Sequence, residues 1–134
     1  MLVPNNAAVA VADGEKLNLF RNTGDETDLK LSPLNVGEVD TDNKSGGVRH
    51  QSSAANPDAS QVQEDSFAAG VVDMLNRQVL LHKIEKLVVI AAPRTLGEMR
   101  KHYHKQLEAA LIGEVPKDLT GHSVQEIEKA LLAA

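Results

Sequence analysis

Alternating apolar and polar positions predict three β-strands near the start of the chain. Residues 7–12 are a run of alanine and valine that ends at Asp13-Gly14, a pair typical of tight turns. Residues 16–21 nearly alternate, so these two segments predict a β-hairpin. Residues 29–36 alternate again, and Pro33 favours an edge position there because proline cannot donate to a sheet ladder.

The composition changes over about 37–59, where Asp, Asn, Ser and Gly dominate and no Leu, Ile or aromatic residue occurs. A segment of this length without apolar positions is usually either functional or disordered. We predict a disordered loop.

Helical spacing follows this segment. Phe67, Val71, Leu75 and Val79 recur on one helical face and predict a helix from about 60 to 81. The continuous apolar run at 87–92 suits a strand buried on both faces. A second helix should follow, with Thr95 and Glu98 as its capping box and an inner face formed by Leu96, Met99, Tyr103 and Leu107.

The last elements are a short strand at 111–115 and a third helix that opens with a capping box of Ser123 and Glu126. The predicted order is therefore β-β-β-α-β-α-β-α. Antiparallel neighbours come first and crossover units follow, which favours an α/β fold with a mixed five-stranded sheet flanked by three helices. We expect one domain over residues 1–134.

Composition excludes several kinds of site. The 134 residues contain no cysteine, so disulfides, thiolate metal sites and thiol nucleophiles are absent. Aromatic residues make up only 2% of the chain, which leaves no aromatic surface for stacking bases. The N-terminus shows neither a secretory signal nor a membrane span, and we expect a cytoplasmic protein that does not insert into a membrane.

The net charge is −5, but its distribution matters more than the sum. Residues 1–65 contain 5 basic and 11 acidic residues, whereas residues 77–105 contain 7 basic and 2 acidic residues. An acidic chain with one basic face does not attract nucleic acid by bulk charge, yet it can hold a phosphate locally. Ordinary solvated helix faces would give the same pattern, and charge alone favours them.

The basic window coincides with the expected start of the second helix, at the carboxyl end of the strand at 87–92. Unpaired backbone N–H groups and the helix dipole favour an anion at such a position. We therefore predict a rim that binds RNA or another anion, formed by Arg94, Thr95, Arg100, Lys101 and Lys117.

A structural interpretation of the same residues carries equal weight. Thr95 would only cap the helix, Arg94 would pair with a carboxylate such as Asp13 or Asp118, and Arg100 would be an ordinary surface residue. The five histidines show no pair with ligand spacing on one helix face. We assign no catalytic residue, no metal and no cofactor.

Several motifs, in this order, resemble the bacterial host attachment protein family, whose members are described as required for attachment to host cells. The likeness spans nearly the whole chain. Its motifs are Val11-Ala-Asp-Gly14, Phe20-Arg-Asn-Thr-Gly24, Phe67-Ala68, Leu75-Asn76, Ala92-Pro-Arg-Thr-Leu-Gly97 with Arg100, Lys117-Asp-Leu-Thr120 and Ile127-Glu128.

The resemblance implies a domain similar to the middle domain of archaeal and eukaryotic peptide-chain release factors, with a ribonuclease H-like topology, and an association with ribosomes or tRNA. Two departures matter. A two-metal nuclease would need a carboxylate where Arg94 stands, so Asp13 is better explained as a turn residue. The segment Ser45-Gly-Gly-Val-Arg-His-Gln51 only partly matches the Gly-Gly-Gln tip of release factors, because its glutamine lies four residues after the second glycine.

The sequence therefore favours a non-catalytic module that contacts RNA or a ribosomal surface through the basic rim. The alternatives are a release-factor-like esterase acting on peptidyl-tRNA, and an adaptor that binds another protein and acts indirectly in host attachment. The oligomeric state stays open.

Overall fold

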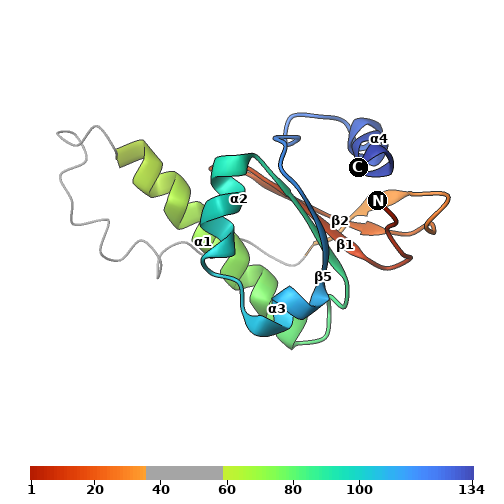
Figure 1. The fold of residues 1–134 in the computed structure, drawn as a ribbon, viewed down its shortest axis with the longest axis horizontal. Coiled ribbons are helices and arrows are strands. Elements are labelled where there is room, and N and C mark those ends of the chain that lie inside the picture. Colours follow the sequence, from red (N-terminus) through yellow and green to blue (C-terminus); the bar gives the residue numbers. More distant parts are fainter. Residues whose placement is uncertain (36–58) are drawn as a thin grey trace.

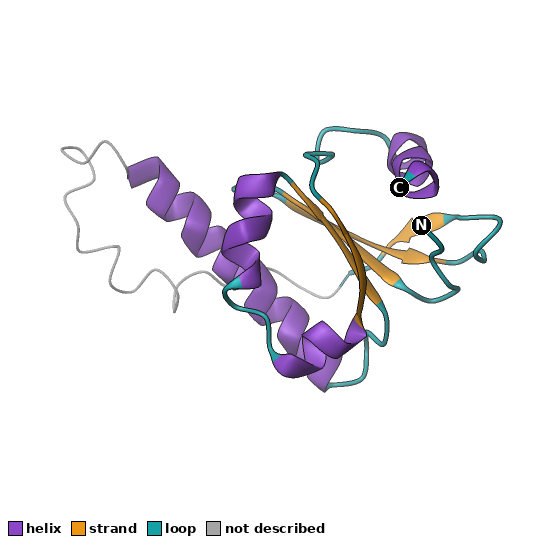
Figure 2. Cartoon of the chain, in the orientation of Figure 1, coloured by secondary structure: helices purple, strands orange, loops and turns teal. Residues whose placement is uncertain are grey.

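The computed structural model describes residues 1–35 and 59–134. This part of the chain forms an open, mixed five-stranded sheet with four helices (Figure 1, Figure 2). The predicted loop at 37–59 therefore lies outside the described residues, except for residue 59. In chain order the elements are β1 (Ala8–Ala12), β2 (Leu17–Asn22), β3 (Leu31–Pro33), α1 (Ala59–Leu80), β4 (Leu87–Ala91), α2 (Pro93–Arg100), α3 (Lys105–Ala110), β5 (Leu111–Val115) and α4 (Val124–Ala133).

The strands lie in the order β3-β2-β1-β4-β5. β1 pairs antiparallel with β2 and parallel with β4, and β4 pairs parallel with β5. Ala12 lies opposite Ala91, and Ile90 lies opposite Val115. The carboxyl ends of β1, β4 and β5 therefore meet at one border of the sheet, which we call the strand-end edge.

Helices cover both faces of the sheet: α1, α2 and α3 lie on one face and α4 lies on the other (Figure 1). Side chains of β1 and β4 point alternately into the two cores. Ala10 and Val89 join the core beneath α1, whereas Val9 and Val88 join the core beneath α4. Both strands are buried throughout, which confirms the expectation from the apolar run at 87–92. No helix in the described ranges is long and apolar enough to cross a membrane.

The structure confirms the mixed five-stranded sheet, the helix predicted at 60–81 and the strand at 111–115. The third strand is shorter than predicted and ends at Pro33. The prediction of three helices is wrong because the second one divides into α2 and α3. Asn76 of α1 hydrogen-bonds the backbone of the segment between α2 and α3. Its Nδ2 donates to the His102 carbonyl at 3.0 Å, and its Oδ1 accepts from the His104 N–H at 3.1 Å.

The two predicted capping boxes have different outcomes. Ser123 and Glu126 form theirs at the start of α4, as expected. Thr95 does not cap α2, because the helix already begins at Pro93, after Ala92 at the cap position, and no side chain caps it. Proline suits the first helical position, where its fixed φ fits and no N–H is needed. The ribonuclease H-like topology stays a prediction.

Candidate functional site

The strand-end edge brings together residues that are far apart in the sequence. Asp13 follows β1, Arg94 lies in the first turn of α2 directly after β4, and Lys117 follows β5. In open α/β sheets, ligands bind in the crevice outside the carboxyl ends of the strands. The predicted rim therefore lies partly at the border where such sheets bind ligands.

Asp13 organises the turn between β1 and β2. Its Oδ1 accepts the N–H groups of Glu15 and Lys16 at 2.7 and 2.6 Å. Burial opposes ionisation of this carboxyl, but these two bonds and the Thr120 hydroxyl outweigh it and lower its pKa. Gly14 is required next to it, since a Cβ there would lie 2.6 Å from Cγ of Glu64 on α1. Asp13 is thus a turn residue, and it forms no ion pair with Arg94.

The Asp118 carboxylate accepts hydrogen bonds from Thr120, two residues later in the chain. The Thr120 hydroxyl oxygen lies 2.8 Å from Oδ1 of Asp118 and 2.9 Å from Oδ2 of Asp13. A hydroxyl has one proton, so it can donate to only one of the two carboxylates at a time. The structural interpretation of the sequence offered Asp13 or Asp118 as a partner of Arg94, whereas in the structure the Thr120 hydroxyl contacts both carboxylates.

Arg94 lies in a shallow hollow between the first part of α1 and α2. The hollow has a volume of about 380 Å³ and is lined by Gln61, Asp65, Pro93, Arg94, Gly97, Glu98 and Lys101. Arg94 is exposed and forms no ion pair with any residue that the structure describes. The Asp65 carboxylate in the same hollow accepts a bond from the Gln61 amide at 2.7 Å.

Thr95 is the third residue of α2 and is half-buried. Since no side chain caps this helix, the backbone N–H groups of Arg94 and Thr95 remain available to an anion that approaches beside the Arg94 guanidinium. The contribution of Thr95 to the predicted rim is therefore its backbone rather than its hydroxyl.

Arg100 is the last residue of α2, so it lies about 9 Å along the helix axis from Arg94. Its guanidinium forms a salt bridge with Glu114 of β5, in which Nη2 donates to Oε1 at 2.8 Å and Nε donates to Oε1 at 3.2 Å. The Tyr103 hydroxyl donates to the same carboxylate at 2.9 Å. Burial opposes ionisation of Glu114, yet the bonds from Arg100 and Tyr103 lower its pKa. Arg100 thus already has an anionic partner and lies away from the helix start.

The two lysines of the predicted rim differ. The Lys101 Nζ lies 3.1 Å from Oε1 of Glu98, whose other oxygen is 3.0 Å from His102 Nε2. These contacts outweigh burial and lower the Glu98 pKa. Lys117 is exposed, and within the described part of the chain its side chain forms no ion pair. Arg94 and Lys117 are therefore the cations of the rim without an ion-pair partner among the described residues.

The chemistry of this edge is limited. Across residues 1–35 and 59–134 no three His, Asp or Glu side chains are grouped so that they could hold a metal ion. The segment Ser45–Gln51, which partly matches the release-factor tip, lies outside the described residues. Within the described residues, the edge offers two cations without ion-pair partners and an uncapped helix start, a combination that can bind an anion.

The sequence did not reveal the cluster of Arg100, Tyr103 and Glu114, because it joins a helix end to an edge strand. The pairing of Asp13 with Thr120 across 107 positions was equally hidden. One signal was available: Arg100 falls at the end of a helix that starts at a proline, which places it away from the helix N-terminus.

A model of bacterial archaeo-eukaryotic release factor family 12 matches residues 6–131, nearly the whole chain. A comparison with curated proteins gave no match. The family match supports the release-factor part of the expected resemblance, while the host-attachment part stays a prediction. Because the match includes every described strand and nearly all of the four helices, this chain belongs to bacterial archaeo-eukaryotic release factor family 12.

Proposed function

We propose that this release-factor-like domain binds RNA, on a ribosome or as tRNA, without catalysing a reaction. The observation that carries the proposal is the exposed Arg94 guanidinium beside the uncapped start of α2, at the carboxyl ends of the parallel strands. Phosphate groups favour such positions because the helix dipole and the free N–H groups add to the arginine charge. Lys117 supplies a second contact at the same border.

The binding we propose is moderate and local. Asp65 and Glu98 line the same hollow as Arg94, so the edge carries no large positive field. Contacts to phosphate position a protein on RNA but do not read its sequence. We therefore expect weak sequence preference and a shallow dependence on salt, set by the small number of phosphate contacts.

Fluorescence anisotropy with tRNA and ribosomal RNA fragments tests the proposal. Arg94→Ala with Lys117→Ala should weaken binding and lower the slope of log K against log salt by about 1.4–1.8, since each of the two phosphate contacts contributes roughly 0.7–0.9. The matched control is Lys86→Ala with Lys129→Ala, which removes two exposed lysines away from this edge. Asp65→Asn should raise the affinity, because it removes a negative charge beside Arg94. Equal affinities for all four proteins would refute the proposal.

A release-factor-like esterase remains the second candidate, favoured by the family match. It requires cleavage of a peptidyl-tRNA analogue that is lost on changing Gly47 or Gln51. An indirect role in attachment to host cells, through a protein partner, is the third, and capture of a defined partner from cell extract would be its test.

A further inference from the structure

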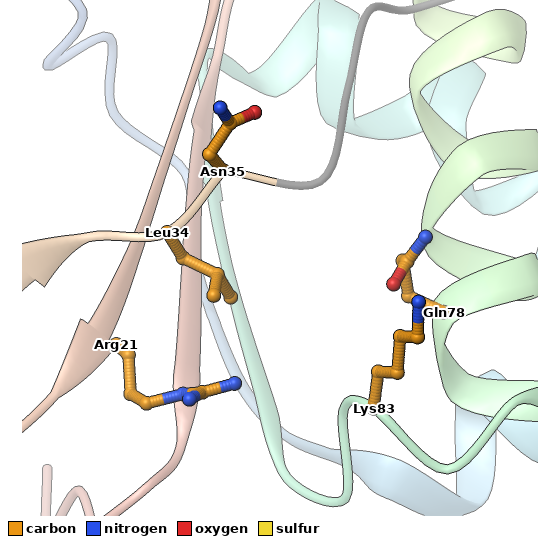
Figure 3. Close-up of a pocket in the computed structure, with 5 residues that line it drawn as sticks. All are labelled: Arg21, Leu34, Asn35, Gln78 and Lys83. Carbon is orange, nitrogen blue, oxygen red and sulfur yellow. The ribbon is translucent and has the colours of Figure 1, made fainter.

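A second anion site is suggested at the opposite border of the sheet, where β1 and β4 begin. A pocket of about 370 Å³ lies there between the sheet and the last turns of α1, lined by Arg21, Leu34, Asn35, Gln78 and Lys83 (Figure 3). We call it the amino-end pocket. Arg21 of β2 lies opposite Ala8, the first residue of β1, and Lys83 lies in the turn that leads to β4.

Two polar residues occupy positions in the pocket that the surrounding pattern would assign to the core. Leu17 and Leu19 pack beneath α1, and Arg21 continues the same face of β2. Gln78 follows Val71 and Leu75 on the inner face of α1. In Figure 3 the Arg21 side chain and the Gln78 and Lys83 side chains enter one space from opposite sides.

Gln78 is 8% exposed, and its Oε1 has no hydrogen-bond partner in the described structure. Buried polar atoms without a partner are rare in folded proteins, and each calls for an explanation. This oxygen is an acceptor, so the group that satisfies it must donate a proton.

The charged residues that the structure describes around the pocket, Arg21 and Lys83, are both basic. Neither Arg21 nor Lys83 forms an ion pair with a residue in the described ranges, and no acid is found among the described residues that line the pocket. The Lys83 backbone is held in place, since its N–H donates to the Gln78 carbonyl at 2.9 Å. Leu34 is fixed by its N–H bond to the Leu19 carbonyl at 2.8 Å. Backbone hydrogen bonds therefore fix residues on both sides of the pocket, Lys83 after α1 and Leu34 after β3.

We propose that the amino-end pocket binds a small phosphate monoester or inorganic phosphate. The charged oxygens would contact Arg21 and Lys83, and a P–OH or a neighbouring hydroxyl would donate to Gln78 Oε1. The volume lies at the lower end of the roughly 300–1,000 Å³ typical of small-molecule sites, which fits a ligand of this size. The site is separate from the strand-end edge and does not depend on the function proposed there.

Calorimetric titration and thermal unfolding with inorganic phosphate and with ribose 5-phosphate test this site, with ribose as the uncharged control. Both anions should bind and raise the unfolding temperature, because a ligand that binds only the native state stabilises it. Arg21→Gln and Lys83→Gln should each weaken binding about tenfold or more, as expected for a lost charge-assisted hydrogen bond. Lys83 is exposed, so its variant should fold normally.

Two control variants and one further test variant make the result decisive. Lys86→Gln removes a nearby exposed cation outside the pocket and should leave binding unchanged. Arg94→Ala with Lys117→Ala should also leave it unchanged, which separates this site from the strand-end edge. Gln78→Leu should fold stably but bind phosphate more weakly. The proposal would be overturned if neither inorganic phosphate nor ribose 5-phosphate bound, or if the Arg21→Gln and Lys83→Gln double variant bound them as tightly as the wild type.

The phosphate could belong to a free metabolite or to the end of a nucleic acid. A short RNA with a 5′-phosphate, compared with the same RNA carrying a 5′-hydroxyl, distinguishes these sources. Preference for the phosphorylated RNA end over ribose 5-phosphate, lost in Lys83→Gln, would assign the nucleic acid as the source. Binding of ribose 5-phosphate alone would assign a metabolite.

Discussion

Asn22, within the family-like motif Phe20-Arg-Asn-Thr-Gly24, should be one of the most sensitive positions of the fold. It is completely buried. Its Nδ2 donates to the Val3 carbonyl at 2.9 Å and, at 3.3 Å each, to the carbonyls of Pro4 and Asp25. Its Oδ1 accepts the N–H groups of Gly24 at 2.9 Å and Lys30 at 3.1 Å. One amide thus ties the N-terminal segment to the turn between β2 and β3.

Asn22→Ala removes all five bonds. The three shorter ones contribute about 1 kcal/mol each, and the buried groups left without partners add to the loss. We expect the free energy of unfolding to fall by about 3–5 kcal/mol, a large part of the roughly 5–15 kcal/mol typical of a domain. Urea unfolding followed by circular dichroism measures this, with an unchanged m-value as the check on two-state behaviour. A loss below about 1 kcal/mol would refute the argument, since it would mean that the amide network is not needed.

Asn22→Asp separates hydrogen bonding from shape, because the side chains have nearly the same size. Oδ1 can still accept from Gly24 and Lys30, but the second oxygen would face the carbonyl oxygens of Val3, Pro4 and Asp25. The buried acid should therefore have a raised pKa. Its penalty appears as the pH rises above the unfolded value of about 3.9, so this variant should be closest to wild type in acid and weakest at neutral pH. A penalty independent of pH would contradict this explanation.

Three further outcomes follow from named contacts. Glu114 has a lowered pKa, so its contacts with Arg100 and Tyr103 stabilise the fold above the unfolded pKa of this carboxyl and are lost as the pH falls through its folded pKa. The free energy of unfolding of Glu114→Gln, measured with urea at several acidic pH values, should therefore depend less on pH than that of the wild type. Leu75→Ala should cost about 2–5 kcal/mol in urea unfolding, because Leu75 is fully buried. Gly24→Ala should lower the melting temperature, because its Cβ would meet the carbonyl oxygen of Asp28, which is backbone and cannot rotate away.

Periodicity predicted the sheet well because its central strands are buried on both faces, which leaves a continuous apolar run at 87–91 and a small-residue run at 8–12. The break between α2 and α3 was missed because a side chain of a different helix, Asn76, satisfies the backbone there. The capping pattern at Thr95 led to a wrong start for α2, because Pro93 begins that helix two residues earlier.

The candidate site was predicted only in part. Strand order could place Arg94 at the carboxyl edge of the sheet, because that depends on topology. Whether an arginine keeps its charge unpaired depends on side chains brought together by the fold, and sequence spacing does not contain that information. Arg100 shows the difference, since its partner Glu114 lies on another element. The position of Arg21 on the same face of β2 as Leu17 and Leu19 follows from the alternation at 16–21, but its place opposite Gln78 depends on how α1 packs on the sheet.

The two anion sites differ in a way that decides what each can hold. At the strand-end edge, Arg94 shares its hollow with Asp65 and Glu98, so no concentrated charge is available to retain a small ion. A polyanion is suited to such an edge, because it gains affinity from several dispersed contacts and from counterion release. Among the described residues, the amino-end pocket is lined by two cations and no acid, and it has a buried acceptor and a limited volume. Those properties select one small phosphate group, so loss of binding at one border should leave the other intact.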